Sequence, residues 1–192
     1  MRWLVMLMAV VLLAACGRSG GSDPEEAARK ELAKQAVMAK MAHPKPVYRD
    51  ELFELKLHIE RTTVKAGEPI AASASLTYIG DQPKITVWGA RSFLTFAIHD
   101  ANGFAMEGAS TAERAPTGLN RGQTYAYPFF KSGGYDSQAP DADFWRAFYA
   151  EKELRLPAGR YVLEANLSFD LHEALDGRAA YRAAAHATIT VE

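Results

Sequence analysis

The stretch YVLEANLSFDL, residues 161–171, decides the fold because it places an apolar side chain at every second position. Those apolar positions are Tyr161, Leu163, Ala165, Leu167, Phe169 and Leu171. Successive side chains of a β-strand point to opposite faces of its sheet, so this period of two predicts a strand with one dry face. Residues 53–59 and 181–191 repeat the alternation and predict two more strands of the same kind.

Turn sequences such as Gly80-Asp81 and Pro157-Ala158-Gly159 separate further short strand candidates. These candidates cover about 69–79, 84–88, 92–99, 103–107 and 123–130. Helical segments that could support parallel crossovers do not occur between them, which favours two antiparallel sheets packed face to face. We therefore expect an all-β fold, an immunoglobulin-like antiparallel β-sandwich, with a jelly roll or a small closed barrel as the alternative.

The first residues have the features of an export signal. Arg2 precedes an uncharged run from Trp3 to Ala15, which is shorter than the roughly 20 apolar residues of a membrane-spanning helix. Cys16, the only cysteine in the chain, follows directly. The arrangement resembles the signal of a bacterial lipoprotein, which implies a signal peptide over 1–15 and an acylated Cys16 that anchors the protein to the membrane on its extracytoplasmic face. Gly17 is not the aspartate that retains lipoproteins in the inner membrane, so the outer membrane is expected in a Gram-negative cell.

Residues 16–50 are predicted to form a flexible tether and a spacer helix, and residues 51–192 the sandwich. Asp23 suits the N-cap position, Pro24 the first helical position and Glu26 the capping box, which predicts a helix over about 24–41. Two interpretations of this helix stay open. It is either a solvated spacer or a docking element that uses a thin apolar stripe, made up of Leu32, Val37, Met38 and Met41.

Composition argues against several classes of function. The formal net charge is −1, from 22 basic and 23 acidic residues, which suggests neither a nucleic-acid partner nor a polybasic membrane patch. With Cys16 committed to lipidation, no thiol is left for a disulfide. The five histidines stand far apart, without the spacing of a metal site, and no motif of nucleophilic or metal-dependent catalysis occurs. We expect no enzymatic activity, no metal and no cofactor.

An aromatic insertion at about 131–152 is the most informative region for binding. Seven aromatic residues occur between positions 129 and 149, in the long connection between two strands. Long loops on a rigid β scaffold often carry function, and Trp, Tyr and Arg dominate binding hot spots. The candidate partner-binding residues are Tyr135, Trp145, Arg146 and Tyr149. The structural alternative is a short helix over 143–151 whose aromatic side chains plug one open end of the sandwich.

The order of the strands and turns also resembles a known domain. The segments concerned are Ile85 to Gly103, Leu119 to Gln123 and Leu156 to Tyr161. In this order they resemble the BsuPI-type proteinase-inhibitor domain, an immunoglobulin-like fold. The resemblance implies inhibition of an envelope protease, through the loop Gly108–Gly122 or through the aromatic insertion, but it assigns no inhibitory residue. Separately, residues 63–70 resemble the first hairpin of many bacterial immunoglobulin-like modules, and residues 156–161 resemble the turn into the penultimate strand, where Tyr161 can make a tyrosine corner.

These observations lead to three functional hypotheses. The first is a membrane-anchored, extracytoplasmic module that binds a protein or an envelope polymer without catalysis. The second is a BsuPI-like inhibitor of an envelope protease. The third is a module that binds cell-wall carbohydrate through Trp145 and Tyr149.

Overall fold

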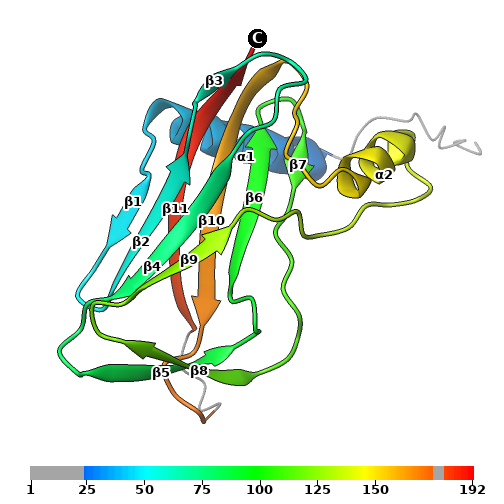
Figure 1. Ribbon diagram of the computed structural model, residues 1–192. Helices are drawn as coiled ribbons and strands as arrows, with labels where there is room; N and C mark the ends of the chain where they lie inside the picture. Colours follow the sequence, from blue (N-terminus) through cyan, green and yellow to red (C-terminus); the bar gives the residue numbers. More distant parts are fainter. Residues whose placement is uncertain (1–23, 175–179) are drawn as a thin grey trace, which may run out of the picture.

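The computed structural model describes residues 24–174 and 180–192 (Figure 1). The expected signal peptide over 1–15, the expected lipidation site Cys16 and the expected flexible tether before Pro24 lie outside the described residues. The described chain is mostly β, with several sheets that are compatible with a β-sandwich. Within these ranges no helix has the length and apolar character needed to cross a membrane.

Two larger sheets form the body of the domain. One has the strand order β1-β2-β4-β9, with β1 at Val47–Arg49, β2 at Phe53–Ile59, β4 at Ala72–Tyr78 and β9 at Thr124–Pro128. The other has the order β3-β11-β10-β6-β7, with β3 at Thr63–Val64, β11 at Tyr181–Val191, β10 at Gly159–Phe169, β6 at Leu94–Asp100 and β7 at Ala105–Met106. Neighbouring strands are antiparallel, except that β3 runs parallel to β11.

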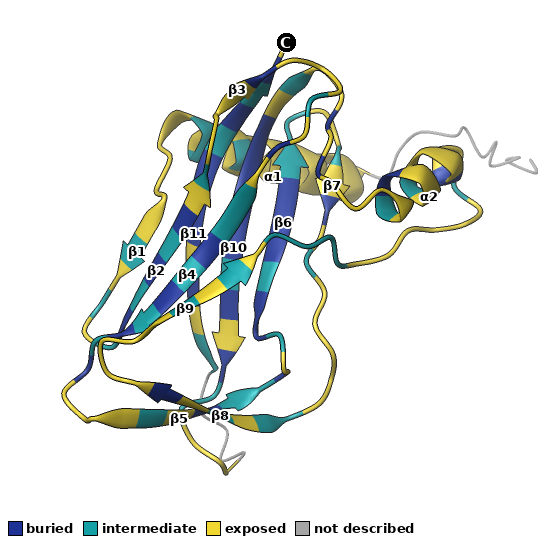
Figure 2. Cartoon of the chain, in the orientation of Figure 1, coloured by how far each residue is buried: buried dark blue, intermediate teal, exposed yellow. Residues whose placement is uncertain are grey.

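The core lies between these two sheets (Figure 2). Leu163 of β10 stands opposite Ala187 of β11 and Ile98 of β6, and all three residues are buried. Leu55 and Leu76, from the facing sheet, are also fully buried in the same cluster. The alternation of apolar residues in 53–59, 161–171 and 181–191 therefore predicted these inward-facing positions correctly.

A third, two-stranded sheet closes one end of the domain (Figure 1). It pairs β5, Lys84–Gly89, with β8, Ala115–Asn120. The backbones of Trp88 and Asp170 exchange two hydrogen bonds of 2.9 and 2.8 Å, which tie this sheet to the end of β10. The guanidinium of Arg114 lies 5.7 Å from the centre of the Trp88 ring and pairs with Asp170 at 3.1 Å.

Two expectations about local structure are wrong. Residues 63–70 do not form a hairpin, because β3 leaves the first sheet and pairs in parallel with the last strand, β11. The segment Gly108–Gly122 is not a free loop either, because β8 occupies much of it. The sequence of β8, APTGLN, contains Pro116 and Gly118 and has no alternating pattern, so its pairing with β5 could not be seen from local residues.

The two helices lie on different parts of the sandwich (Figure 1). Helix α1, Pro24–Ala42, crosses the outer face of the five-stranded sheet, and the hydroxyl of Thr188 on β11 donates to the Met41 carbonyl at 3.1 Å. Helix α2, Ala142–Ala150, packs at one end, which agrees with the short helix expected over 143–151. Because α1 covers the outer face, the first half of β10 is buried on both sides, and not on one side as its sequence pattern predicts.

Candidate binding surface

Helix α2 is held to the sandwich by aromatic packing beneath it. Phe148 is buried, with its ring centre 5.8 Å from that of Phe104, which follows β6. Phe104 also contacts Trp145 at 5.1 Å and Tyr161, at the start of β10, at 5.3 Å. Phe148 and Trp145 therefore close this end of the sandwich as the plug interpretation predicts, whereas Phe144 keeps 40% of its surface exposed.

Part of the aromatic insertion faces outward. Tyr135 is 37% exposed, and its ring stacks on that of Tyr149 with 6.0 Å between centres and 14° between planes. Tyr149 in turn lies 6.1 Å from Trp145, whose far side contacts Phe144. We call these four residues, Tyr135, Phe144, Trp145 and Tyr149, the aromatic surface. Burial, together with the charge of Glu107, raises the pKa of Tyr149 above its ordinary value.

Three of the four candidate binding residues are thus brought together, and the fourth lies at their side. Arg146 forms an ion pair with Asp143, one turn before it, at 2.7 Å, and 63% of its side chain is exposed. It extends from the same helix as Trp145 and Tyr149. Trp145 is fixed by a hydrogen bond of 2.8 Å from its indole nitrogen to the carboxylate of Asp141.

Two residues that the sequence did not single out position this surface. The ammonium of Lys131 donates to the carbonyls of Phe148 and Glu151, at 2.6 and 2.7 Å, and lies 4.2 Å from the centre of the Phe148 ring. It therefore caps the C-terminal end of α2, and its burial lowers its pKa. Gly133 has φ +124°, and a Cβ atom there would lie 2.4 Å from the carbonyl oxygen of Glu107. The partners of both residues are distant in sequence, so no local signal could reveal them.

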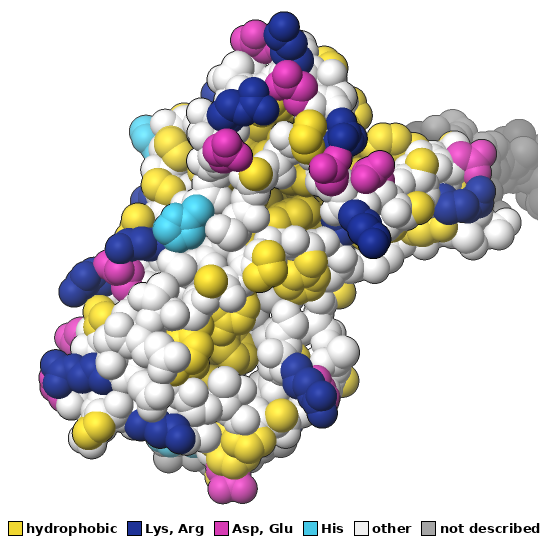
Figure 3. Space-filling view, in the orientation of Figure 1, with side chains coloured by type: hydrophobic (Ala, Val, Ile, Leu, Met, Phe, Trp, Pro, Cys, Tyr) yellow, Lys and Arg dark blue, Asp and Glu magenta, His cyan; other side chains and the backbone are white. Residues whose placement is uncertain are grey.

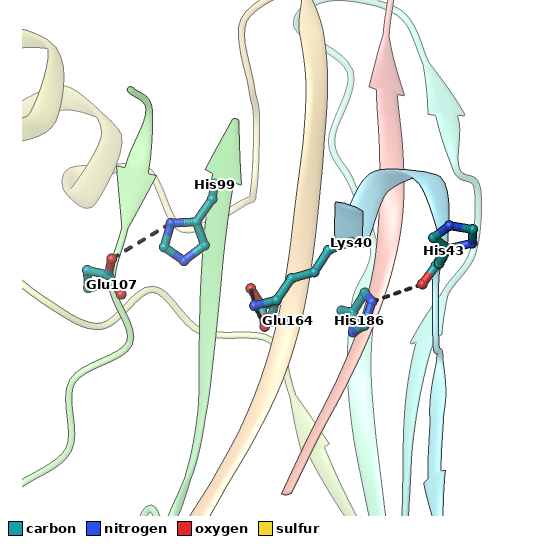
Figure 4. A network of polar contacts seen from close by, with 6 residues as sticks. All are labelled: Lys40, His43, His99, Glu107, Glu164 and His186. Carbon is teal, nitrogen blue, oxygen red and sulfur yellow. Dashed lines mark hydrogen bonds and ion pairs between the residues drawn. The ribbon is translucent and has the colours of Figure 1, made fainter. Parts of the chain in front are cut away.

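A second group of polar residues lies under α1, on the outer face of the five-stranded sheet (Figure 4). Lys40 contacts both carboxylate oxygens of Glu164, at 2.7 and 2.8 Å. His186, directly opposite Glu164 in the β10–β11 ladder, lies 3.2 Å from the carbonyl of His43. At the other side of α1, His99 lies 3.7 Å from Glu107. In the described parts of the chain, no group of three His, Cys, Asp or Glu residues could hold a metal ion.

His186 occupies a polar position of the alternation over 181–191, which would place it on an exposed face of its strand, but the structure buries it. It retains only 9% of its surface, because α1 and the residues after it cover the polar side of β11. His58, by contrast, is exposed and bonds Ser75 at 2.8 Å, as a surface histidine would. The difference arises from a helix more than 100 positions away in the chain, which the alternation of a strand does not report.

The surface beside these sites is hollowed between α1 and the five-stranded sheet. A groove of about 820 Å³ separates the first turns of α1 from the turn between β6 and β7. Lys34, Val37, His99 and Phe104 are among the residues that line it. On the face drawn in Figure 3, basic and acidic side chains of the described residues are interspersed rather than gathered by sign.

Comparisons with known proteins assign no family to this chain. Neither a protein-family model nor a curated protein matches the sequence. Among solved structures, the chain is similar to Spo0M, a sporulation control protein from Bacillus subtilis, with 11% identity and a TM-score of 0.36, over 73% of this chain and 49% of Spo0M. It is also similar to the β-glucosidase EmGH1 from Erythrobacter marinus, with 18% identity and a TM-score of 0.34, over 73% of this chain and 15% of the glucosidase. The chain thus spans about half of the first protein and a small part of the second.

Proposed function

We propose that the protein is a lipoprotein, anchored through Cys16 at the extracytoplasmic face of a membrane, that acts as a non-catalytic binding module. The aromatic surface is its contact site for a protein or an envelope polymer. The anchor is supported by the apolar run that ends at Ala15 and by the single cysteine that follows it. Two or more acyl chains hold a protein stably to a bilayer, so no other membrane element is needed.

We further propose that the sandwich is immunoglobulin-like. The strand order supports this, because an early strand pairs in parallel with the last strand while its predecessor stays in the opposite sheet. The Tyr161 hydroxyl also donates to the Pro157 carbonyl at 2.9 Å, close to the start of the penultimate strand. This is the hydrogen bond of a tyrosine corner, a feature of such domains.

The arrangement of Tyr135, Tyr149 and Trp145 carries the proposal for binding. Aromatic side chains lose little conformational entropy on binding, and here their rings are already held against one another and against the buried Phe148. Arg146, next to Trp145 in the same helix, adds an exposed cation that is paired with Asp143. A preorganised group of Tyr, Trp and Arg on a rigid support is the composition of a binding hot spot.

Crosslinking in the native cells tests this proposal. A photoreactive amino acid at position 135 should capture a partner, and Tyr149→Ala in the same chain should reduce that capture by about tenfold or more, as expected for a hot-spot residue. Val47, on β1, is 47% exposed and far along the sequence, so Val47→Ala is the matched control and should leave the capture unchanged. Equal capture by the Tyr149→Ala and parent proteins would contradict the assigned surface.

Carbohydrate is a second candidate ligand, favoured by the parallel stacking of Tyr135 on Tyr149 beside polar groups. If it is the ligand, the full-length protein should sediment with cell-wall glycan, and Trp145→Ala combined with Tyr149→Ala should abolish the sedimentation. Inhibition of a protease would instead appear as slowed cleavage of a peptide substrate by a panel of serine proteases. Retention of glycan binding by the double variant would remove the carbohydrate candidate.

The anchor has its own test. Cys16→Ser should move the protein from the membrane fraction to the soluble extracytoplasmic fraction, because the acyl chains are the proposed attachment. A Cys16→Ser protein that stays with the membrane would show that another element holds it there. Mass spectrometry of the N-terminal peptide of the parent protein checks the acylation directly.

A further inference from the structure

Helix α1 lies on the five-stranded sheet with almost no apolar burial of its own. None of its 19 residues is buried, and only Val37, Lys40 and Met41 are even half-buried. Leu32 and Met38, two large apolar residues of the helix, are 66% and 52% exposed. The apolar stripe that the sequence offers for docking is therefore used only at its C-terminal end.

The contacts that hold α1 are polar and lie close together. Lys40 binds both oxygens of Glu164, and the Met41 carbonyl accepts from Thr188. Just beyond the helix, Lys45 and His186 exchange two backbone hydrogen bonds, of 2.9 and 2.8 Å. Toward the other end, the helix diverges from the domain, since its residues 27 to 37 form one wall of the 820 Å³ groove.

The covered face of the sheet is suited to both a closed and an open state. Beneath the helix lie two small apolar residues, Ala97 and Val162, which are 3% and 0% exposed and which release would uncover, and beside them lies Glu164, a carboxylate with 6% of its side chain exposed. When α1 is docked, Lys40 compensates this charge; when α1 leaves, water solvates it. A polar contact of this kind exchanges protein partners for water with a small net change in free energy.

We propose that α1 is a releasable strap that closes over the outer face of the five-stranded sheet, with its grip at Lys40 and Glu164. Residues 43–46, His-Pro-Lys-Pro, are the hinge, because prolines interrupt the helix there and Lys45 stays paired with β11. Release exposes the Glu164–His186 face and frees a segment that is marginally helical alone, as isolated helices of this length are in water.

The strap gives the proposed lipoprotein two different lengths of connection between the lipid and the domain. Seven residues, 17 to 23, separate Cys16 from the start of α1. While the strap is closed, only those residues connect the lipid to the domain; when it opens, the 19 residues of α1 lengthen that connection, by about 28 Å where they stay helical at 1.5 Å per residue. This consequence rests on the proposed anchor at Cys16, whereas the strap itself does not depend on it.

Hydrogen exchange on the full-length protein tests the strap. We expect the amides of residues 37–42 to exchange faster than those of β10 and β11, and Lys40→Ala to speed their exchange about fivefold, the effect of losing one partly exposed ion pair. Lys30→Ala is the matched control, because Lys30 pairs with Glu26 on the same helix but touches no strand through that pair. It should change the exchange of residues 37–42 by less than about twofold. The exchange of β10 and β11 should be unchanged in both variants.

Exchanging the charges of Lys40 and Glu164 tests whether this ion pair holds the strap closed. Lys40→Glu alone should open the strap, and Lys40→Glu combined with Glu164→Lys should restore slow exchange in residues 37–42. The proposal is overturned if α1 and β10 exchange at the same rate and lose protection together, since α1 would then be a permanent layer. It is also overturned if Lys40→Ala and Lys30→Ala have equal effects. The same measurements on the Cys16→Ser protein should give the same result, so a failure of the anchor and a failure of the strap are told apart.

Discussion

Helix α1 has 19 residues and helix α2 has nine, yet the shorter helix is the more firmly packed. Helix α2 buries Phe148 and Ala142 and joins a network of aromatic rings that reaches Tyr161 in the core. Helix α1 buries no residue and holds on through a few polar contacts at one end. The difference shows that the apolar area a helix buries, rather than its length, fixes it to a sandwich.

The largest effect is expected where α2 meets the core. Phe148→Ala should lower the free energy of unfolding by about 3–5 kcal/mol, because it removes a buried ring and leaves a cavity. Phe144→Ala, on the same helix but 40% exposed, should cost less than about 1 kcal/mol. Urea denaturation measures both. Equal costs would break the comparison, since α2 would then not be held by apolar burial.

Asp50 provides a test of the stability of the sandwich that is separate from the tests on the two helices. Burial alone would raise its pKa, but hydrogen bonds from the amides of Phe53 and Leu52 and the hydroxyls of Tyr181 and Tyr48 outweigh it and lower the pKa below the usual value. A carboxyl with a lowered pKa in the folded state stabilises the fold above its unfolded pKa. That contribution is lost as the pH falls through the folded pKa.

The free energy of unfolding should therefore decline as the pH drops below about 4, near the ordinary pKa of aspartate. Asp50→Asn should cost about 1.5–3 kcal/mol at neutral pH, the range for hydrogen bonds to a charged group, and should flatten the acid decline. Chemical denaturation at several pH values checks this. An unaltered acid profile in Asp50→Asn would show that other carboxyls set it.

A smaller effect is expected at the end of α2. Lys131→Met keeps most of the aliphatic chain but removes the two hydrogen bonds to the carbonyls of Phe148 and Glu151, which should cost about 1–2 kcal/mol. Hydrogen exchange should show faster opening of the last turn of α2. Unchanged exchange there would mean that the aromatic packing alone holds the helix.

The smallest effect on global stability is expected from α1. Lys40→Ala should change the free energy of unfolding by less than about 1 kcal/mol, because 41% of the lysine side chain is exposed and the helix opens before the sandwich unfolds. Thermal or urea unfolding of the variant measures it. A loss as large as that of Phe148→Ala would place α1 in the cooperative core and remove the contrast between the two helices.

The sequence predicted the parts of the fold that depend on local pattern. The alternation from Tyr161 to Leu171 located β10 and its inward face, and the acidic start of 143–151 located α2. The sequence also named Tyr135, Trp145 and Tyr149 as candidates, and these rings contact one another; that they bind a partner stays a prediction. What it could not predict depends on contacts between distant segments. Glu164 and His186 alternate as surface residues would, and only the position of α1 buries them.

The same dependence on contacts between distant segments explains the two wrong predictions of local structure. Thr63-Val64 is too short to carry a pattern, and its partner is the last strand of the chain. Pro116 and Gly118 are unusual in strands, so β8 exists only because β5 lies beside it. Such pairings are set by the register of the whole sandwich rather than by the residues of either segment.

Two tryptophans near opposite ends of β10 can serve as optical reporters. Trp145 contacts Phe104, which meets Tyr161 at the start of this strand. Trp88 is hydrogen-bonded through its backbone to Asp170, just beyond the other end of the 11-residue strand. The Trp88 indole lies beneath a guanidinium, whereas the Trp145 indole is bonded to a carboxylate. With Trp3 replaced, the emission of each indole in a single-tryptophan protein would report ligand capture and denaturation separately at the two poles of the domain.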